Sequence, residues 1–297
     1  MIEENTHEPQ IGNRMGFIET IDDTLTLYRG LLEPDYVSDL SFEEKMLMRE
    51  AVEKIKRADL YFMGEEFEDI LGDYYSQFDD VDYPNMRFSE FTRPCSRICY
   101  IRLNHFTKIL NEQKVDISES TANFAFITEY FEDKTTSILC ASPLSAPTYI
   151  GTYHPDNGIF FPKGLPEEQH EPFTNVIVRI AGAFELINNP KFVVSEKAGT
   201  RAQRKQMKRE QDICLEAWHK ITWNVDKSTV ALNDNDRGGW RMPLHYTRGH
   251  PRKAEPHHKN VMYKNGKPYK WIHGFWSGHP AYGIKKGYHA PTTNKAA

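Results

Sequence analysis

The sequence predicts an α+β protein with an acidic, mainly helical N-terminal part, a small antiparallel sheet, and a basic C-terminal part with short strands and one basic helix. Three observations predict this class. Apolar residues recur at helical spacing in the first third, and short β-branched and aromatic runs follow from residue 121. The charge then changes sign near residue 190. We therefore expect three regions: an acidic helical region at 1–120, a strand-rich region with one amphipathic helix at 121–190, and a basic His/Trp-rich region at 191–297.

The first third is expected to hold several helices. Residues 21–32 have helical character, and a second helix begins after Ser41, which forms a capping-box pair with Glu44. Its apolar positions are Leu47, Ala51, Ile55, Ala58 and Phe62. Residues 65–82 predict an amphipathic helix with an acidic outer side; Mg²⁺ binding, mimicry of nucleic-acid phosphates and docking against the basic region are alternatives. Residues 88–111 predict another helix.

The middle and the end of the chain alternate strand and helix signals. Short strands are expected over 123–131, 136–140, 148–153 and 158–161, and an amphipathic helix over 173–187 ends at Asn188-Asn189-Pro190. A strand at 192–194 leads to a basic helix at 200–211. Further strands are expected at 221–225 and 269–275, with a tight hairpin at Asn265-Gly266.

Net charge is −5, but this figure averages two unlike parts. Residues from Lys191 onward carry 21 Lys and Arg against 8 Asp and Glu, whereas the preceding residues carry 16 against 34. Such asymmetry indicates a polyanion-binding surface at the C-terminal end, or a charge match between the two parts.

Five cations of the basic helix, Arg201, Arg204, Lys205, Lys208 and Arg209, fall at i, i+3, i+4, i+7 and i+8. That spacing places them on one helix face, where like charges repel one another unless an anion lies opposite. Phosphate binding is the functional interpretation, and a solvated surface helix is the alternative.

The densest group of potentially reactive side chains is His245, Arg248, His250 and Arg252. Two histidines with neighbouring arginines could cleave RNA without metal, with one base, one acid and arginine on the developing phosphorane charge. If the segment is a strand, residues 248, 250 and 252 share one face and 245 lies on the other. Alternatively, the histidines and tryptophans hold together a small domain that is poor in apolar residues.

No cofactor is predicted, since Gly-rich phosphate loops, His-Glu-x-x-His, Gly-x-Ser-x-Gly and EF-hand patterns are missing from the sequence. Zinc is a weaker possibility, with His245 and His250 joined by one of His257, His258 or Cys214. Cys95 and Cys99 would form half of another zinc site if they shared a helix face; two buried apolar residues are the alternative.

The four cysteines show no repeated Cys-x-x-Cys spacing, no apolar run approaches the ~20 residues of a membrane span, and the first residues are acidic. We therefore expect reduced thiols, no membrane association and a cytoplasmic location.

Aromatic residues interleave with the cations of the C-terminal region, and among them Trp271 and Trp276 are candidates for stacking on unpaired bases. The leading expectation is therefore a nucleic-acid-binding protein that acts through its basic C-terminal third, with RNA or single-stranded DNA favoured over duplex. One alternative is the His/Arg-based ribonuclease. Another is an interaction protein that binds a host or virion partner through its acidic half.

A series of short motifs resembles a group of uncharacterised phage and prophage proteins that close with an Arg-Gly-His block and an aromatic tail. The motifs are Ile187-Asn-Asn-Pro190, the basic segment Arg201–Arg209, His219-Lys-Ile-x-Trp223, His245-x-x-Arg-Gly-His-x-Arg252, Trp271, Gly278 and Gly283-x-x-Lys286-x-Tyr288. The resemblance spans roughly residues 185–289. It departs at Pro251 and Lys253, where those proteins carry aromatic residues. It implies a phage-encoded protein in the host cytoplasm and implies no activity.

Overall fold

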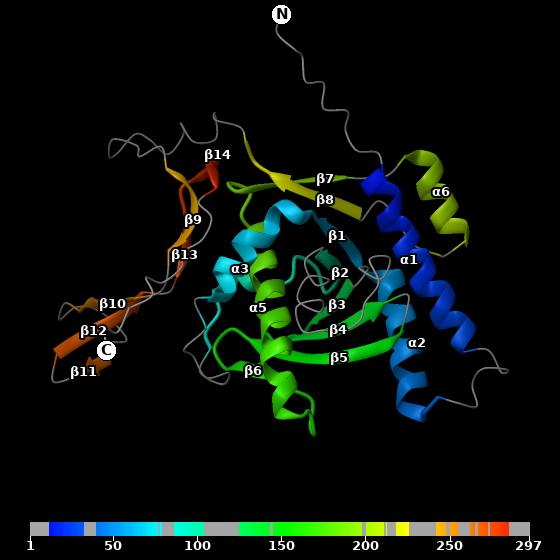
Figure 1. Ribbon diagram of the computed structural model, residues 1–297, viewed down its shortest axis with the longest axis horizontal. Coiled ribbons are helices and arrows are strands. Elements are labelled where there is room, and N and C mark those ends of the chain that lie inside the picture. The colour runs from blue at the N-terminus through cyan, green and yellow to red at the C-terminus, as the bar shows by residue number, and fades with distance from the viewer. Residues whose placement is uncertain are drawn as a thin grey trace, which may run out of the picture.

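An eight-stranded mixed sheet forms the centre of the protein in the order β6-β5-β4-β3-β2-β1-β8-β7 (Figure 1). Strand β1 runs parallel to both β2 and β8, and the other neighbours are antiparallel. The strands are β1 Asp59–Met63, β2 Ile98–Leu103, β3 Ala125–Tyr130, β4 Thr136–Ser142, β5 Ser145–His154, β6 Gly158–Phe160, β7 Val193–Lys197 and β8 Trp218–Trp223.

The computed structural model describes residues 12–32, 40–76, 78, 86–103, 125–142, 145–197, 200–210, 212, 218–225, 242–247, 250–254, 262–264, 267–272 and 274–284. Its α-helices are α1 Gly12–Leu31, α2 Phe42–Arg57, α3 Glu68–Ser76, α5 His170–Ile187 and α6 Arg201–Glu210. Short 3₁₀ turns occur at η2 Glu65–Phe67, η4 Glu90–Thr92 and η6 Glu167–Gln169. None of the helices within these ranges is long and apolar enough to cross a membrane.

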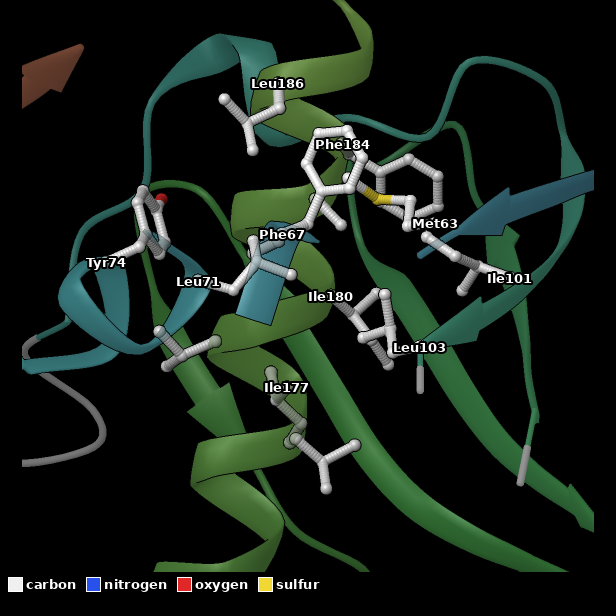
Figure 2. Packing of buried hydrophobic residues seen from close by; sticks show 14 of the residues in the cluster. Met63, Phe67, Leu71, Tyr74, Ile101, Leu103, Ile177, Ile180, Phe184 and Leu186 are labelled. Atoms are coloured by element: carbon white, nitrogen blue, oxygen red, sulfur yellow. The ribbon is translucent and has the colours of Figure 1, made fainter. Parts of the chain in front are cut away.

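Helices cover both faces of the sheet, so the core has two layers. On one face, α3 and α5 pack against β1 and β2 through residues such as Leu71, Phe184, Met63 and Ile101 (Figure 2). On the other face, α1 and α2 pack against the sheet, and Met207 of α6 joins the same cluster. Strands buried on both faces are typical of sheets that contain parallel pairs with helices on either side.

The expected fold class is wrong, because the sheet is large, mixed and enters the region that the sequence predicts to be helical. Helix α2 ends at Arg57, and Phe62 lies in β1 instead of continuing the helix. Residues 98–103, predicted as helix, form β2. Both strands are buried on both faces, so they lack the alternation that marks a half-exposed strand, and a short apolar run of this kind resembles a buried helix.

Several local predictions are confirmed. Both bonds of the Ser41–Glu44 capping box are present, and α2 begins directly after Ser41. Helix α5 ends at Ile187, before Asn188-Asn189-Pro190, and the basic helix α6 lies within the predicted range 200–211.

Two three-stranded sheets follow the main sheet. One has the order β13-β9-β14 and the other β10-β12-β11. In the second, Lys264 pairs with Lys267, as a hairpin that turns at Asn265-Gly266 requires, and the two turn residues themselves lie outside the described residues. The strands are β9 Pro243–Thr247, β10 His250–Lys253, β11 Met262–Lys264, β12 Lys267–Ile272, β13 Phe275–Ser277 and β14 His279–Ile284.

The acidic and basic parts of the chain are in direct contact. Strand β8, from the basic region, pairs with β1 from the acidic region. Tyr246 of β9 and Trp276 of β13 pack against Tyr74 of α3, with ring centroids 5.1 and 6.1 Å from that of Tyr74. The main sheet thus takes strands from all three regions that the sequence distinguishes.

Candidate nucleic-acid interface

Helix α6 carries five cations and packs against the protein core through a single buried apolar side chain. Thr200 caps the helix: its Oγ1 accepts from the backbone N–H of Gln203 at 3.2 Å, and the Gln203 Oε1 accepts from the Thr200 N–H at 2.9 Å. Met207 is the one buried residue of the helix, and it lies in the same apolar cluster as Trp218. The remainder of α6 can therefore face solvent or a ligand.

Four cations of α6, Arg201, Arg204, Lys205 and Lys208, have no ion-pair partner within the described part of the chain. Arg209 differs, because its guanidinium lies 2.9 Å from the Glu210 carboxylate. Arg204 is half-buried and the other three are exposed. Like charges at i,i+3 and i,i+4 destabilise a helix, so an anion bound along this stripe would relieve the repulsion.

A second group of cations, without ion-pair partners among the residues that the structure describes, lies on the sheet β10-β12-β11. Arg252 of β10 is directly opposite Lys270 of β12, and both side chains are exposed. Lys253 and Lys267 are exposed on the other face, since Lys253 is opposite Tyr269, two residues from Lys267. Like charges directly opposite each other destabilise a strand pair. The described residues of these three strands include no Asp or Glu.

The histidines and arginines of the predicted reactive segment are divided between two sheets. His245 lies on β9, half-buried and opposite Ser277, whereas His250 and Arg252 lie on β10 of the other small sheet. The Arg248 residue and the His250 side chain lie outside the described residues. The structure thus brings His250 and Arg252 into one strand and leaves His245 in a different sheet.

The hydrogen bond of His245 defines its tautomer. Its Nδ1 lies 2.9 Å from the carbonyl oxygen of Pro243, which can only accept, so Nδ1 carries the proton. In the neutral ring, Nε2 then keeps its lone pair, as a general base requires. His279 is a different case, since it is 2% exposed and its Nδ1 accepts from the backbone N–H of Ala281.

Of the two tryptophans predicted to stack on bases, Trp276 is buried and the side chain of Trp271 is not described. Trp276 is 7% exposed and its ring packs against Tyr74 and Tyr246, so its faces belong to the protein core. Trp271 lies on β12 opposite Pro251, and its side chain is outside the described residues. The neighbouring Phe275 is 46% exposed and is an aromatic ring of this region that solvent reaches.

A polar cluster that the sequence does not predict surrounds the start of β8. His219 stacks on Tyr61 with ring centroids 5.1 Å apart, and its Nδ1 lies 3.0 Å from the Ser195 Oγ. The Cys95 Sγ donates to the Asn188 Oδ1 at 3.3 Å. These residues come from distant parts of the chain, and no motif or spacing links them. The parallel pairing of β1 with β8 places Tyr61 beside His219, and the antiparallel pairing of β7 with β8 brings Ser195 close to them. Cys95 joins the cluster through a hydrogen bond with Tyr61.

The ionisation states in this cluster argue against a cysteine nucleophile. Desolvation raises the pKa of the Cys95 thiol to about 12, and desolvation likewise lowers the pKa of His219. At neutral pH the thiol is protonated and the imidazole is uncharged. An activated cysteine needs the opposite shifts, toward thiolate and imidazolium.

The structure offers no assembled metal centre within the ranges it describes, where no group of three or more His, Cys, Asp and Glu side chains could hold an ion. Cys99 lies on β2 and not on a helix, and desolvation raises the pKa of its thiol. Comparison with protein-family models, curated protein sequences and solved structures finds no match. Functional inference for this chain therefore rests on its own geometry and chemistry.

Proposed function

We propose that this protein binds single-stranded nucleic acid through its basic C-terminal third, in the cytoplasm of a host cell and in a phage-encoded setting. The observation that carries the proposal is the opposition of Arg252 and Lys270 across β10 and β12 with no carboxylate in the described part of that sheet. The strand pair places two positive charges together at a cost in stability. A phosphate group between them would convert this repulsion into two favourable contacts.

The cation stripe of α6 supports the same class of ligand. Arg201 and Lys208 are separated by seven residues, or about 10 Å along a helix axis. This length suits a few phosphates of one strand. Helix α6 and the sheet β10-β12-β11 lie toward opposite ends of the long axis of the molecule (Figure 1). A flexible strand would therefore follow the protein surface from one to the other, or two segments would bind separately.

Aromatic side chains in the same C-terminal region favour a strand with unpaired bases over a duplex. Phe275 of β13 is 46% exposed, and Tyr269 of β12 is half-buried on the face that carries Lys253 and Lys267. Unpaired bases stack on aromatic rings while Lys and Arg neutralise the phosphates, a combination common in proteins that bind single strands.

The test is a salt titration of oligonucleotide binding by fluorescence anisotropy. We expect the full chain to bind a single-stranded oligonucleotide with an affinity that falls steeply with salt, because each neutralised phosphate releases counterions. The double variant Arg252→Ala/Lys270→Ala should bind more weakly, and its salt slope should be smaller by about 1 for each phosphate that it no longer neutralises. Lys163→Ala, which removes an exposed cation from a loop before α5, is the matched control and should leave the slope unchanged.

Two outcomes would contradict this proposal. One is the lack of measurable binding at low ionic strength. The other is an equal decrease of affinity in the double variant and in the Lys163 control. The ribonuclease alternative is tested by incubating an RNA oligonucleotide with the protein in the presence of a chelator. Cleavage that the His245→Ala variant no longer performs would favour a metal-independent ribonuclease.

A further inference from the structure

A hollow outside the basic region is lined by aromatic rings, cations and carboxylates, the three kinds of side chain that recognise a nucleotide. It has a volume of about 600 Å³ and lies where η4, the β3–β4 turn, the β5–β6 turn and the end of α5 meet. This volume is within the range of small-molecule sites, ~300–1,000 Å³. All the residues that line it precede Lys191, so the hollow is separate in sequence from the proposed nucleic-acid interface.

The walls of the hollow are fixed by hydrogen bonds to backbone carbonyl groups. The Asn188 Nδ2, at the end of α5, donates to the carbonyl oxygens of Phe91 and Arg93 at 2.8 and 2.7 Å. The backbone N–H of Phe88 donates to the Pro155 carbonyl at 3.0 Å, which ties the η4 segment to the β5–β6 turn. Such a site is formed before a ligand arrives, so binding would not require ordering of the chain.

The aromatic part of the hollow is Tyr130 together with Phe91. The guanidinium of Arg93 lies 5.8 Å from the centroid of the Tyr130 ring, within the range of a cation–π contact. Phe91 is 53% exposed, an apolar ring at the surface that a planar ligand would cover. Aromatic rings hold unpaired nucleobases by stacking, so Tyr130 and Phe91 can contact a base.

The charged residues that line the hollow include both cations and carboxylates. Arg93 and Lys134 are exposed cations with no ion-pair partner among the residues that the structure describes. Glu90 and Asp156 are exposed carboxylates on the same hollow. A simple anion would be repelled by these carboxylates. A nucleotide satisfies both, because its phosphate pairs with the cations and its ribose hydroxyls donate to a carboxylate, as in dinucleotide sites.

Lys134 also occupies an unfavourable backbone conformation. Its φ is +69°, a left-handed conformation that costs roughly 1–2 kcal/mol for a residue other than glycine. The tight turn from Phe131 to Thr135 holds it there, with the Phe131 N–H donating to the Thr135 carbonyl at 2.9 Å. Backbone strain of this kind occurs at ligand clamps, and the turn directs a lysine, not a glycine, to the edge of the hollow.

We propose that this hollow binds a nucleoside monophosphate unit, with the base against Tyr130 and Phe91 and the phosphate on Arg93 and Lys134. The unit is either a free mononucleotide or the terminal nucleotide of a strand. Both sources present the same base, ribose and phosphate to the site, and the experiment distinguishes them.

The test is calorimetric titration of the full chain with each of the four ribonucleoside monophosphates. It includes a second arm with a short 5′-phosphorylated oligonucleotide and its unphosphorylated form, measured in the Arg252→Ala/Lys270→Ala variant. We expect Arg93→Ala and Lys134→Gly each to weaken binding about tenfold or more, because each removes one charge-assisted hydrogen bond to the phosphate. Lys134→Gly is expected to fold, because glycine adopts a positive φ without the steric cost that a Cβ imposes, so the melting temperature should be maintained or raised. Lys163→Ala is again the control.

Each result has a definite meaning. Monophosphate binding that both variants weaken supports the site with a free nucleotide, and binding of the phosphorylated oligonucleotide alone supports it with a strand end. The inference is overturned if neither ligand binds at millimolar concentration, or if both variants bind as the unmodified chain does. Weak oligonucleotide binding by the C-terminal double variant, with unchanged monophosphate binding, would separate this site from the C-terminal interface.

Discussion

At the scale of single residues, Glu185 is a carboxyl group buried in the protein core. It lies on α5 inside the larger apolar cluster and is 6% exposed. Burial raises its pKa from 4.5 to about 7, although hydrogen bonds from Tyr74 and Ser89 act in the opposite direction. The folded protein therefore favours the protonated carboxyl, while the unfolded chain ionises at an ordinary pH.

This shift predicts that stability falls as pH rises from about 4.5 to about 7. Below that window both states hold the proton, and within it only the unfolded chain releases it, so stability decreases by an amount on the order of 3 kcal/mol. Glu185→Gln keeps the shape and removes the charge. We expect the variant to gain stability relative to the unmodified chain at pH 8 but not at pH 4, measured by urea unfolding. The same difference at both pH values would refute this expectation, and Glu132→Gln on an exposed turn is the control.

At the scale of elements, the contact between α3 and α5 depends on the lack of a side chain at Gly182. A Cβ there would lie 2.7 Å from the Tyr74 Cδ1, too close for any carbon contact. Tyr74 cannot move away easily, because it is 1% exposed and packs against Tyr246 and Trp276. The helix pair is thus close-packed at the point where the C-terminal sheet also docks.

Gly182→Ala should therefore destabilise the protein by about 1–3 kcal/mol, in spite of the better helix propensity of alanine. Gly72→Ala on α3 is the matched control, since its Cβ would meet only the end of the Arg179 side chain at 3.5 Å. That variant should be neutral or more stable by up to ~1 kcal/mol. Thermal unfolding of the two variants provides the comparison, and an equal effect of both would show that Tyr74 can shift.

At the scale of the whole molecule, the C-terminal sheet β13-β9-β14 is joined to the acidic half through aromatic packing. Trp276 lies 4.8 Å from Tyr246 and 6.1 Å from Tyr74 between ring centroids. We expect Trp276→Ala to cost about 3–5 kcal/mol, as for a large buried aromatic residue. Phe275→Ala, one residue earlier and 46% exposed, should change stability little. Urea unfolding measures both, and a small effect of Trp276→Ala would show that the packing of the sheet β13-β9-β14 on α3 contributes little to stability.

The sequence alone determines the features that depend on neighbours in the chain. The Ser41–Glu44 capping box, the end of α5 before Pro190 and the strand pairing on either side of Asn265-Gly266 follow from local chemistry, and the structure confirms them. The change of charge near residue 190 is evident from composition, and the cation stripe of α6 is evident from residue spacing. Propensity, capping and turn formation act over a few residues, so a single sequence contains the information for them.

Tertiary structure decides the features that depend on partners far along the chain. Strands β1 and β2 owe their conformation to burial on both faces, which gives no alternating pattern, and β8 joins β1 from more than 150 residues away. The hollow beside Arg93 and Tyr130 exists only because two turns and the end of α5 meet there. The same applies to Trp276, an apparent surface aromatic that the fold buries. Burial and long-range pairing are properties of the folded chain, and local spacing does not encode them.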